Sequence, residues 1–387
     1  MEAEIVVVGA GPAGAMTAMD LAQRGHDVIL IDRHDFPRDK ICGDAVPAHA
    51  IEQMWSHGMK DVVANEVDKG HFHVVRSMRL VSPHGHAAEA DFHLGAMGAH
   101  SVVAPRIYLD AALQRHAVAS GARFVIGQAQ EPILENGYVT GVRVRVDKED
   151  KEIRGKMVVA ADGVTSVIAR ALRPAQDEPQ DGHRAVAIRA YIEDMELVKD
   201  QIEFFLYKGI LPGYAWVFPI SDSEANIGLG MRLDKFRGLK GNLKDMLGYF
   251  LEIPDVKKRL RRGGVMREVR SWQLNFGSQD IQRAFNGALF VGDAAGLINP
   301  LTGGGIDNAL TAGVLAGQTI HEAFSAHDFS REQLKIYETR VDDEMRRSMR
   351  NSYFFQRWLL RFPFIIDILI KRMGADSSFA QTFMSKL

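Results

Sequence analysis

The chain has 387 residues, which is enough for two closely joined domains or for one large domain with an inserted lobe. Hydrophobic residues make up 46% and charged residues 25% of it, a balance that excludes a disordered, collagenous or small disulfide-stabilised protein. The 47 Lys and Arg nearly equal the 49 Asp and Glu, so we expect no binding of nucleic acid. The single cysteine, Cys42, cannot close an internal disulfide, which favours a reducing, cytoplasmic location.

The start of the chain does not resemble a signal peptide, because Glu2 and Glu4 lead directly into an apolar run. The longest apolar stretch, 354–370, is interrupted by Arg357 and Pro363. It falls short of the roughly 20 apolar residues that a spanning helix needs. We therefore expect no transmembrane span, and a helix that lies on a membrane surface stays open.

The first part of the chain alternates short apolar strands with helices, which is typical of a parallel sheet covered by helices. Ile5–Val8 predicts a strand, residues 9–14 a turn, and 15–24 a helix that ends at Gly25. Further along we expect a strand at 27–31, a helix near 47–57, a hairpin within 71–92, a helix at 108–120, a strand at 123–126, a hairpin around 135–137 and a strand at 157–161.

The composition of the sequence changes after Arg173. A polar linker leads into strand-rich sequence at 185–231, followed by a helix near 243–251 and a strand near 265–274. Residues 288–292 predict a return to the first sheet, and helices are expected from about Gly305 to the end.

A glycine pattern follows the first strand. Gly9-Ala-Gly-Pro-Ala-Gly14 reads G-x-G-x-x-G, and Asp32 ends the next strand, 18 residues past Gly14. Gly9 and Gly11 permit a tight turn and the close approach of a pyrophosphate, while Gly14 lets the helix meet the strand. The pattern predicts a dinucleotide site in which Asp32 accepts hydrogen bonds from ribose, and it does not distinguish NAD from FAD.

These elements predict an α/β protein. We expect a discontinuous Rossmann-type domain at 1–175 and 280–330, an inserted antiparallel β-sheet substrate lobe at 180–278, and a helical C-terminus at 331–387.

Two later segments resemble motifs of the flavoprotein hydroxylase superfamily. Residues 158–170 resemble its D-G motif, with Asp162 at the turn, and residues 289–300 resemble its G-D motif, with Gly292 and Asp293. The resemblance implies that FAD is the cofactor and that Asp293 binds its ribityl chain.

The finer resemblance is to the geranylgeranyl reductase family. Residues 37–43 are similar to its P-R-x-K-x-C-G segment, and residues 214–219 with 226–230 are similar to its Y-x-W-x-F-P and N-x-G-x-G signature. The likeness runs to about residue 325 and leaves the C-terminal tail without a family motif. It implies an FAD-dependent reductase that saturates carbon–carbon double bonds of geranylgeranyl or polyprenyl chains on a lipid, a quinone or a diphosphate.

The resemblance also implies a set of residues that bind FAD. They are Gly9, Gly11, Ala13, Gly14, Asp32, Arg33, Arg38, Cys42, Gly43, Arg106, Ala129, Asp162, Gly292, Asp293, Gly303, Gly304, Gly305 and Ile306. For Arg106 the alternative is a solvated arginine at a helix start. The three glycines from Gly303 permit close approach to the isoalloxazine, and the helix N-terminus that follows carries about +0.5 charge, which stabilises negative charge on reduced flavin. The alternative is a glycine turn that caps a helix.

Aromatic residues alternate along one strand of the expected lobe. Tyr214, Trp216 and Phe218 share one face of it, and Gly228 and Gly230 share one face of the next strand. Large rings opposite missing side chains predict a slot for an elongated apolar substrate, and packing in the core is the alternative. We expect catalytic roles for Tyr214 and Trp216.

Cys42 is the third candidate catalytic residue. It lies near Arg38 and Lys40, and positive neighbours lower the pKa of a thiol, which predicts a reactive thiolate or a proton donor close to the flavin. The alternative is a small apolar residue that fills space.

His71, His73, His84 and His86 form two i, i+2 pairs without further ligands, so no metal site is expected.

The tail carries an apolar stripe at near-helical spacing within 354–373, flanked by Arg357, Arg361, Lys371 and Arg372, with Pro363 expected to kink the helix. This pattern suits a helix that lies on anionic lipid on the inner face of the cell membrane. The alternatives are docking onto the protein's own core and a dimer contact.

The electrons for the expected reaction come from an external donor, either NAD(P)H or a ferredoxin, because the single dinucleotide fingerprint is assigned to FAD. Two other functions stay open. One is a flavin-dependent monooxygenase or halogenase-like enzyme that acts on an aromatic or polyketide-type substrate, and the other is a non-catalytic FAD-binding membrane adaptor.

Overall fold

The computed structural model describes residues 1–362 and 364–384. The chain forms two compact units, each built from three segments. The first unit takes residues 1–38, 109–180 and 275–351, and the second takes residues 39–108, 181–274 and the described residues from Ser352 onward. The second unit thus includes residues 39–108, which the sequence had placed in the first domain.

The first unit is built on a six-stranded sheet in the order β18-β19-β12-β1-β2-β8. Every neighbouring pair from β19 to β8 is parallel, and β18 is antiparallel to β19. Such a sheet is covered on both faces, which explains why β1 is an unbroken apolar run with all four residues buried. The strands are β1 (Ile5–Val8), β2 (Val28–Asp32), β8 (Arg123–Ile126), β12 (Met157–Ala160), β18 (Ala284–Phe285) and β19 (Ala288–Phe290).

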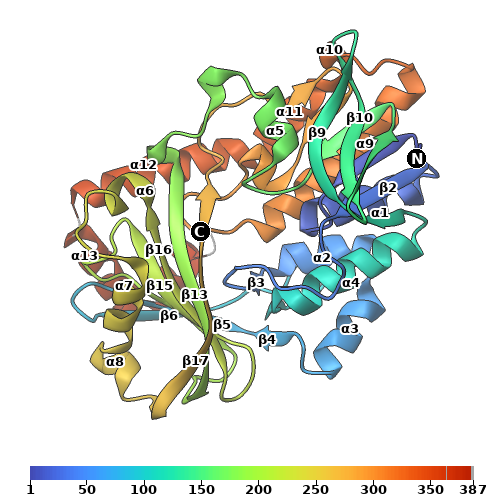
Figure 1. The fold of residues 1–387 in the computed structure, drawn as a ribbon. Helices are drawn as coiled ribbons and strands as arrows, with labels where there is room; N and C mark the ends of the chain where they lie inside the picture. Colours follow the sequence, from blue (N-terminus) through green and yellow to red (C-terminus); the bar gives the residue numbers. More distant parts are fainter. Residues whose placement is uncertain (363, 385–387) are drawn as a thin grey trace. The chain divides into compact units, whose positions relative to one another are not determined.

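Two helices of this unit, α1 (Pro12–Gln23) and α9 (Ile306–Ala326), lie side by side (Figure 1). Small residues permit their close approach, because a Cβ atom on Gly313 of α9 would stand 2.8 Å from the carbonyl oxygen of Ala13. The unit also contains α5 (Val167–Leu172), α10 (Arg331–Leu334), α11 (Ile336–Val341) and an antiparallel sheet in the order β11-β10-β9, made of β9 (Gln128–Glu135), β10 (Tyr138–Val146) and β11 (Glu149–Arg154).

The second unit is built on a seven-stranded sheet in the order β17-β13-β16-β15-β14-β5-β6. Its strands are β5 (Ser77–Val81), β6 (Ala87–Asp91), β13 (Arg184–Met195), β14 (Gln201–Phe205), β15 (Gly213–Pro219), β16 (Ala225–Arg232) and β17 (Leu260–Asn275). The sheet is not purely antiparallel, because β14 and β5 run parallel. The hairpin expected within 71–92 therefore forms, but it extends the sheet of the lobe.

One face of this sheet packs on α7 (Leu243–Leu251), where Leu247 and Phe250 join a buried apolar cluster with Ile227 and Phe205. A smaller sheet has the order β3-β7-β4, made of β3 (Ala45–Val46), β4 (His73–Val75) and β7 (Ser101–Val103). The other helices of the unit are α2 (Ala48–Ser56), α3 (Lys60–Asp68), α6 (Leu233–Phe236), α8 (Pro254–Lys257), α13 (Phe364–Ala375) and α14 (Ser377–Met384), while α4 (Arg106–Ala119) and α12 (Arg347–Arg361) carry residues of both units.

The tail does dock onto the protein with one face. Ile366, Ile370 and Met373 of α13 are buried against Ala88 and Ala90 of β6. Pro363, where the sequence predicts a kink, lies outside the described residues, as do the side chains of 359–361. The expectation of docking is thus confirmed for these three side chains of α13.

Candidate functional site

The glycine turn after β1 is held by close backbone packing. Gly9 has φ +101°, and a Cβ atom there would stand 2.3 Å from the Ala161 carbonyl oxygen. A Cβ atom on Gly14 would stand 1.8 Å from the Gly9 carbonyl oxygen. Both positions therefore require glycine for steric reasons, and Gly14 lets α1 pack directly against the turn, as the sequence predicts.

Asp32 fastens this turn to the end of β2. Its Oδ2 accepts a hydrogen bond from the Ala10 amide at 3.0 Å and from Arg38 Nη2 at 3.3 Å. Arg38 also donates to Oδ2 of the fully buried Asp110 at 2.7 Å. The role of Asp32 as a ribose acceptor stays a prediction, while its structural role is to orient the turn and Arg38.

The three motifs line up at one edge of the sheet. Because β1, β2, β12 and β19 are parallel, their carboxyl ends share that edge. The glycine turn follows β1, Asp32 ends β2, Asp162 follows β12, and Asp293 follows β19. Ligands of open α/β sheets bind outside the carboxyl ends of the strands.

Asp162 presents a free oxygen at this edge. Its Oδ2 accepts a hydrogen bond from the Val167 amide at 2.8 Å and so caps α5. Its Oδ1 is buried and has no hydrogen-bond partner among the described residues. Burial raises the pKa of this carboxyl, and hydrogen bonds with Ser166 and the Val167 amide oppose that rise. A hydroxyl donor on a bound ligand would satisfy the second oxygen.

Two helix N-termini lie in the same motifs. In the part of the chain that the structure describes, neither Gly11 before α1 nor Gly305 before α9 supplies a side-chain cap. No N-cap side chain thus covers either first turn, and backbone N–H groups at helix N-termini bind anions. Gly303 has φ +67°, so the loop before α9 also needs glycine. A glycine turn, an acceptor at Asp162 and two uncapped helix N-termini fit the pyrophosphate and hydroxyl groups of FAD.

The remaining residues expected to bind FAD are dispersed. Arg33 is exposed after β2, and Ala129 lies in β9. Arg106, Cys42 and Gly43 belong to the second unit, where Arg106 is buried in the first turn of α4. Their roles toward FAD stay predictions.

In the second unit, Cys42 belongs to a hydrogen-bonded network. The Cys42 carbonyl accepts from Asn226 Nδ2 at 2.8 Å, and Asn226 Oδ1 accepts from Trp216 Nε1 at 2.9 Å. Asn226 Nδ2 and the Tyr191 hydroxyl each donate to Asp44 Oδ2 at 2.7 Å. The two segments that carry the family resemblance, 37–43 and 214–230, therefore meet at these side chains.

The Cys42 thiol is protonated in this setting. Burial raises its pKa, and this effect outweighs the positive charges of Arg106 and Lys40. Asp44 adds to the rise through its negative charge. The expectation of a lowered pKa is wrong, because the sequence shows the cations near Cys42 but not its burial. A thiol that keeps its proton suits a proton donor and not a standing thiolate.

The aromatic strand pairs with the glycines as expected. Trp216 lies opposite Gly228, and Tyr214 lies opposite Gly230. A Cβ atom on Gly228 would stand 2.3 Å from Trp216 Cζ2, so the indole ring itself fills the space over this glycine. The expectation of an open slot at Gly228 is therefore wrong. Trp216 and Phe218 are buried, and both contribute to an apolar cluster.

The comparison with protein families gives a match to the FAD binding domain family over residues 2–224, which is more than half of the chain. The digeranylgeranylglycerophospholipid reductase of Methanosarcina acetivorans is 32% identical over 347 residues, covering 87% of this chain and 80% of the relative. The chain belongs to the geranylgeranyl reductase family. It is an FAD-dependent oxidoreductase that acts on CH–CH groups.

Two further relatives support this family membership. The menaquinone reductase of Mycobacterium tuberculosis is 30% identical over 326 residues, covering 82% of this chain and 76% of the relative. The solved structure of a geranylgeranyl bacteriochlorophyll reductase-like protein from Thermoplasma acidophilum is 25% identical with a TM-score of 0.86, covering 97% of this chain and 92% of that one.

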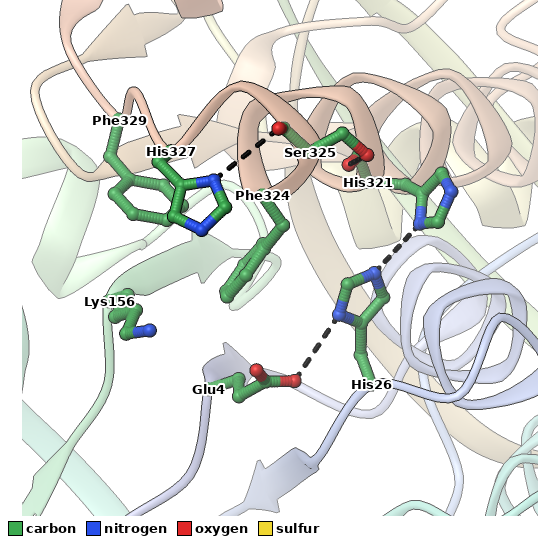
Figure 2. A pocket seen from close by; sticks show the side chains of 8 residues that line it. All are labelled: Glu4, His26, Lys156, His321, Phe324, Ser325, His327 and Phe329. Carbon is green, nitrogen blue, oxygen red and sulfur yellow. Dashed lines mark hydrogen bonds and ion pairs between the residues drawn. The ribbon is translucent and has the colours of Figure 1, made fainter.

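This member of the geranylgeranyl reductase family also has a pocket away from the FAD motifs. Figure 2 shows it within the first unit, with the His26 ring between Glu4 and His321. Glu4 precedes β1 and Lys156 precedes β12, so the pocket lies at the amino ends of these strands, opposite the edge that carries the motifs. We therefore do not assign FAD to it. Its lining consists of Glu4, His26, Lys156, His321, Phe324, Ser325, His327 and Phe329.

Sequence reasoning missed Asp44, Tyr191 and Asp110. Asp44 follows the motif Cys42-Gly43 directly, and a carboxylate between apolar residues was the signal available. Tyr191 lies in a strand where its ring looks like ordinary core. His71 Nδ1 lies 2.6 Å from Glu66 Oε2, and His84 Nδ1 lies 2.7 Å from Asp367 Oδ2. The described residues contain no group of three or more His, Cys, Asp or Glu placed to hold a metal ion.

Proposed function

We propose that this member of the geranylgeranyl reductase family saturates double bonds of geranylgeranyl or polyprenyl chains carried by a membrane lipid. The observation that carries the proposal is the contact between the two family segments, in which Asn226 joins the Cys42 carbonyl to Trp216. Relatives named for a digeranylgeranylglycerophospholipid and for menaquinone support a substrate with a prenyl chain and a head group.

Bound FAD, when reduced, supplies a hydride to one carbon of the double bond. Gly9, Gly11 and Gly14 hold its pyrophosphate at the start of α1, and Asp162 and Asp293 bind its hydroxyl groups. The chain supplies the proton for the other carbon. Cys42 is the donor that we assign, since its thiol retains its proton at neutral pH.

An external donor returns electrons to the cofactor. The fingerprint at 9–14 is the only G-x-G-x-x-G pattern that follows a strand and opens a helix among the described residues, and it is assigned to FAD. We therefore assign a transient encounter with NAD(P)H or with a ferredoxin-type protein, without a second resident dinucleotide.

The surface of the tail fits a lipid bilayer. We define an aromatic ridge along α12, α13 and the residue Phe362 between them by its exposed side chains, Phe354, Trp358, Phe362, Phe364 and Ile368. The rings of Trp358, Phe362 and Phe364 follow one another at centroid distances of 5.9 and 6.2 Å. The exposed cations Arg357, Lys371 and Arg372 flank the ridge, and they match the charge of anionic lipid.

The ridge does not imply a spanning helix. Among residues 1–362 and 364–384, no helix is both long and apolar enough to cross a membrane. We propose peripheral attachment, in which the ridge rests at the lipid boundary and brings the enzyme to substrates dissolved there. A lipid-borne prenyl chain makes such attachment useful, because the enzyme has to reach a chain buried in the bilayer.

The test is a reduction assay with purified holoenzyme. A digeranylgeranyl glycerophospholipid in vesicles and an isoprenoid quinone are each offered with chemically reduced enzyme, and mass spectrometry counts the hydrogen pairs added. Reduction of either substrate supports the proposal, and the comparison identifies the head group. Oxygen consumption that hydroxylates or halogenates an aromatic compound would indicate the monooxygenase class. Reduced enzyme that no prenyl substrate reoxidises would indicate a non-catalytic flavoprotein.

A further inference from the structure

The orientation of the Asn226 amide is determined by its neighbour. Trp216 Nε1 carries a hydrogen and only donates, so the atom that it meets at 2.9 Å has to be the carbonyl oxygen of Asn226. The amide nitrogen then faces the other way, toward the Cys42 carbonyl and Asp44. Asn226 is therefore a donor to Asp44 and cannot act as an acceptor there.

This orientation distinguishes the two oxygens of Asp44. Oδ2 receives hydrogen bonds from both Asn226 and Tyr191, at 2.7 Å each. Oδ1 is buried and has no hydrogen-bond partner among the described residues. With both donors directed at Oδ2, the proton of the neutral acid resides on Oδ1, where no neighbouring group holds it.

Asp44 is fully buried, and its φ of +67° places it in the left-handed region. Tyr191 and Arg189 face it from β13, Asn226 from β16 and Arg106 from α4. Burial raises its pKa to about 7, while these neighbours hold the pKa below the value that burial alone would give. The carboxyl thus gains and loses a proton near neutral pH.

Among the ion pairs of the described residues, Arg189 is joined to Asp39 and not to Asp44. Arg189 is fully buried and donates instead to Asp39 Oδ2 at 2.6 Å. Its guanidinium lies over the Tyr191 ring, 4.3 Å from the ring centroid. The positive charge is therefore close enough to favour the carboxylate without neutralising it permanently.

We propose that Asp44 is the proton reservoir of the reductase, a positioning residue that stores a proton on Oδ1 and returns it to Cys42. The two residues share Asn226 as a donor, and the Asp44 amide donates to Cys42 Sγ at 3.3 Å. The inference rests on the proposed function, in which Cys42 protonates one carbon of the double bond.

The proton balance has three steps. The S–H bond of Cys42 breaks as a C–H bond forms at the substrate carbon that did not receive the hydride, which leaves a thiolate. Oδ1 of Asp44 has no hydrogen-bond partner among the described residues, so a water molecule relays the proton to sulfur. The O–H bond of Asp44 breaks and a new S–H bond forms, which leaves a buried carboxylate. A proton from solvent restores the acid, so each turnover adds one hydride and one proton to the double bond.

A carboxyl titration by difference infrared spectroscopy tests the reservoir in the holoenzyme. Asp44→Asn keeps an acceptor for Tyr191 and Asn226 and tolerates a positive φ, but has no proton to release. We expect the band of a protonated carboxyl to disappear with a midpoint near pH 7 in the wild type. The band is absent from Asp44→Asn and disappears at higher pH in Tyr191→Phe, because the lost hydrogen bond favoured the carboxylate.

Two kinetic readouts complete the test. In Asp44→Asn, alkylation of Cys42 begins at lower pH because the negative charge that raises the thiol pKa is gone. The turnover rate of this variant falls by about tenfold or more, and the rate no longer changes with pH near 7. Asp61→Asn, an exposed carboxyl on α3, serves as the control and leaves all readouts unchanged.

The outcomes are separable. Infrared spectra that are identical in the wild type and Asp44→Asn overturn the reservoir, and so does an unchanged pH profile of turnover. If no prenyl substrate is reduced by the wild type, the proposed function fails, while the carboxyl titration and the alkylation profile still decide whether Asp44 stores a proton beside Cys42.

Discussion

Asn226 Nδ2 lies 2.8 Å from the carbonyl oxygen of Cys42, although 184 positions separate the two residues. The same amide group accepts from Trp216 through its oxygen. One side chain thus fixes the backbone at Cys42 relative to the aromatic strand β15. In this chain the asparagine of β16 thus holds the loop that carries Cys42.

Replacing Cys42 by serine tests whether the thiol takes part in the reaction or only fills space. Serine is close in size and preserves the backbone carbonyl that Asn226 binds, so we expect unchanged FAD content and an unchanged melting temperature. A hydroxyl gives up its proton far less readily than a thiol, so turnover should fall or the number of bonds reduced should change. Lipid products are compared by mass spectrometry, and an unchanged product distribution at an unchanged rate would count against a role in proton transfer.

The glycine turn gives a second prediction. Gly14→Ala places a Cβ atom 1.8 Å from the Gly9 carbonyl oxygen, which has to displace α1 from the pyrophosphate site. We expect purified protein that lacks the yellow colour of FAD. The control is Gly248→Ala in α7, where a Cβ atom would have no neighbour within 4 Å. The control should retain FAD and gain about 0.5–1 kcal/mol of stability, and a yellow Gly14→Ala variant would contradict the assignment.

Much of the first unit was predictable from the sequence. The alternation of apolar strands with helices predicted β1, β2 and β12, and in the second unit α7 begins and ends at the predicted residues. The helix α3 and the strand β11 were not anticipated, because both are polar and lack a strong periodic pattern. Local patterns of this kind reveal an element only where one face of it is buried.

The second unit was less predictable, because its organisation depends on pairing between distant segments. β5 belongs to the sheet of the lobe through its parallel pairing with β14, more than a hundred positions away, and no local signal encodes this. The same limit applies to the site. The motif predicted Cys42, but its raised pKa follows mainly from burial, which a sequence pattern does not show.

Stability should depend on pH through Asp44. The acid binds its proton more tightly in the folded protein, where its pKa is about 7, than in the unfolded chain, where it is 3.8. Its contribution to stability is therefore complete below pH 3.8 and is lost as the pH rises to about 7. Over that range, the free energy of unfolding of the wild type should fall relative to Asp44→Asn by about 1.4 kcal/mol per pH unit. Urea titrations at several pH values measure this difference, and parallel curves for the two proteins would contradict it.

Because the ring of Trp216 lies over Gly228, we expect alanine at Gly228 and alanine at Gly230 to lower stability by different amounts. A Cβ atom on Gly228 would stand 2.3 Å from both the Ile188 carbonyl oxygen and the indole, whereas on Gly230 its nearest neighbour is the Ala187 Cβ atom at 3.3 Å. Gly228→Ala should lose about 1–3 kcal/mol of stability, as overpacked cores do. Gly230→Ala should lose much less. Thermal unfolding compares them, and equal losses would mean that both the indole and the Ile188 backbone readily move aside.

The aromatic ridge predicts salt-sensitive binding to lipid. Phe364 and Ile368 are 59% and 61% exposed, so replacing both by serine removes apolar contact area without disturbing the core. In flotation with anionic liposomes at low salt, we expect the wild type to float and this double variant to stay behind. Each flanking cation adds about 1 kcal/mol near anionic lipid, so high salt should release the wild type as well.

The matched control lies on the other face of the same helix. Ile366 is 6% exposed and packs against β6, so Ile366→Ser should lower the melting temperature by leaving a cavity, whether or not liposomes are present. The double serine variant at Phe364 and Ile368 should not bind liposomes, but its melting temperature should equal that of the wild type. If the wild type does not float at low salt, or if size-exclusion chromatography shows a dimer that the Phe364 and Ile368 substitutions dissociate, then a second copy of the chain covers the ridge and the membrane assignment is wrong.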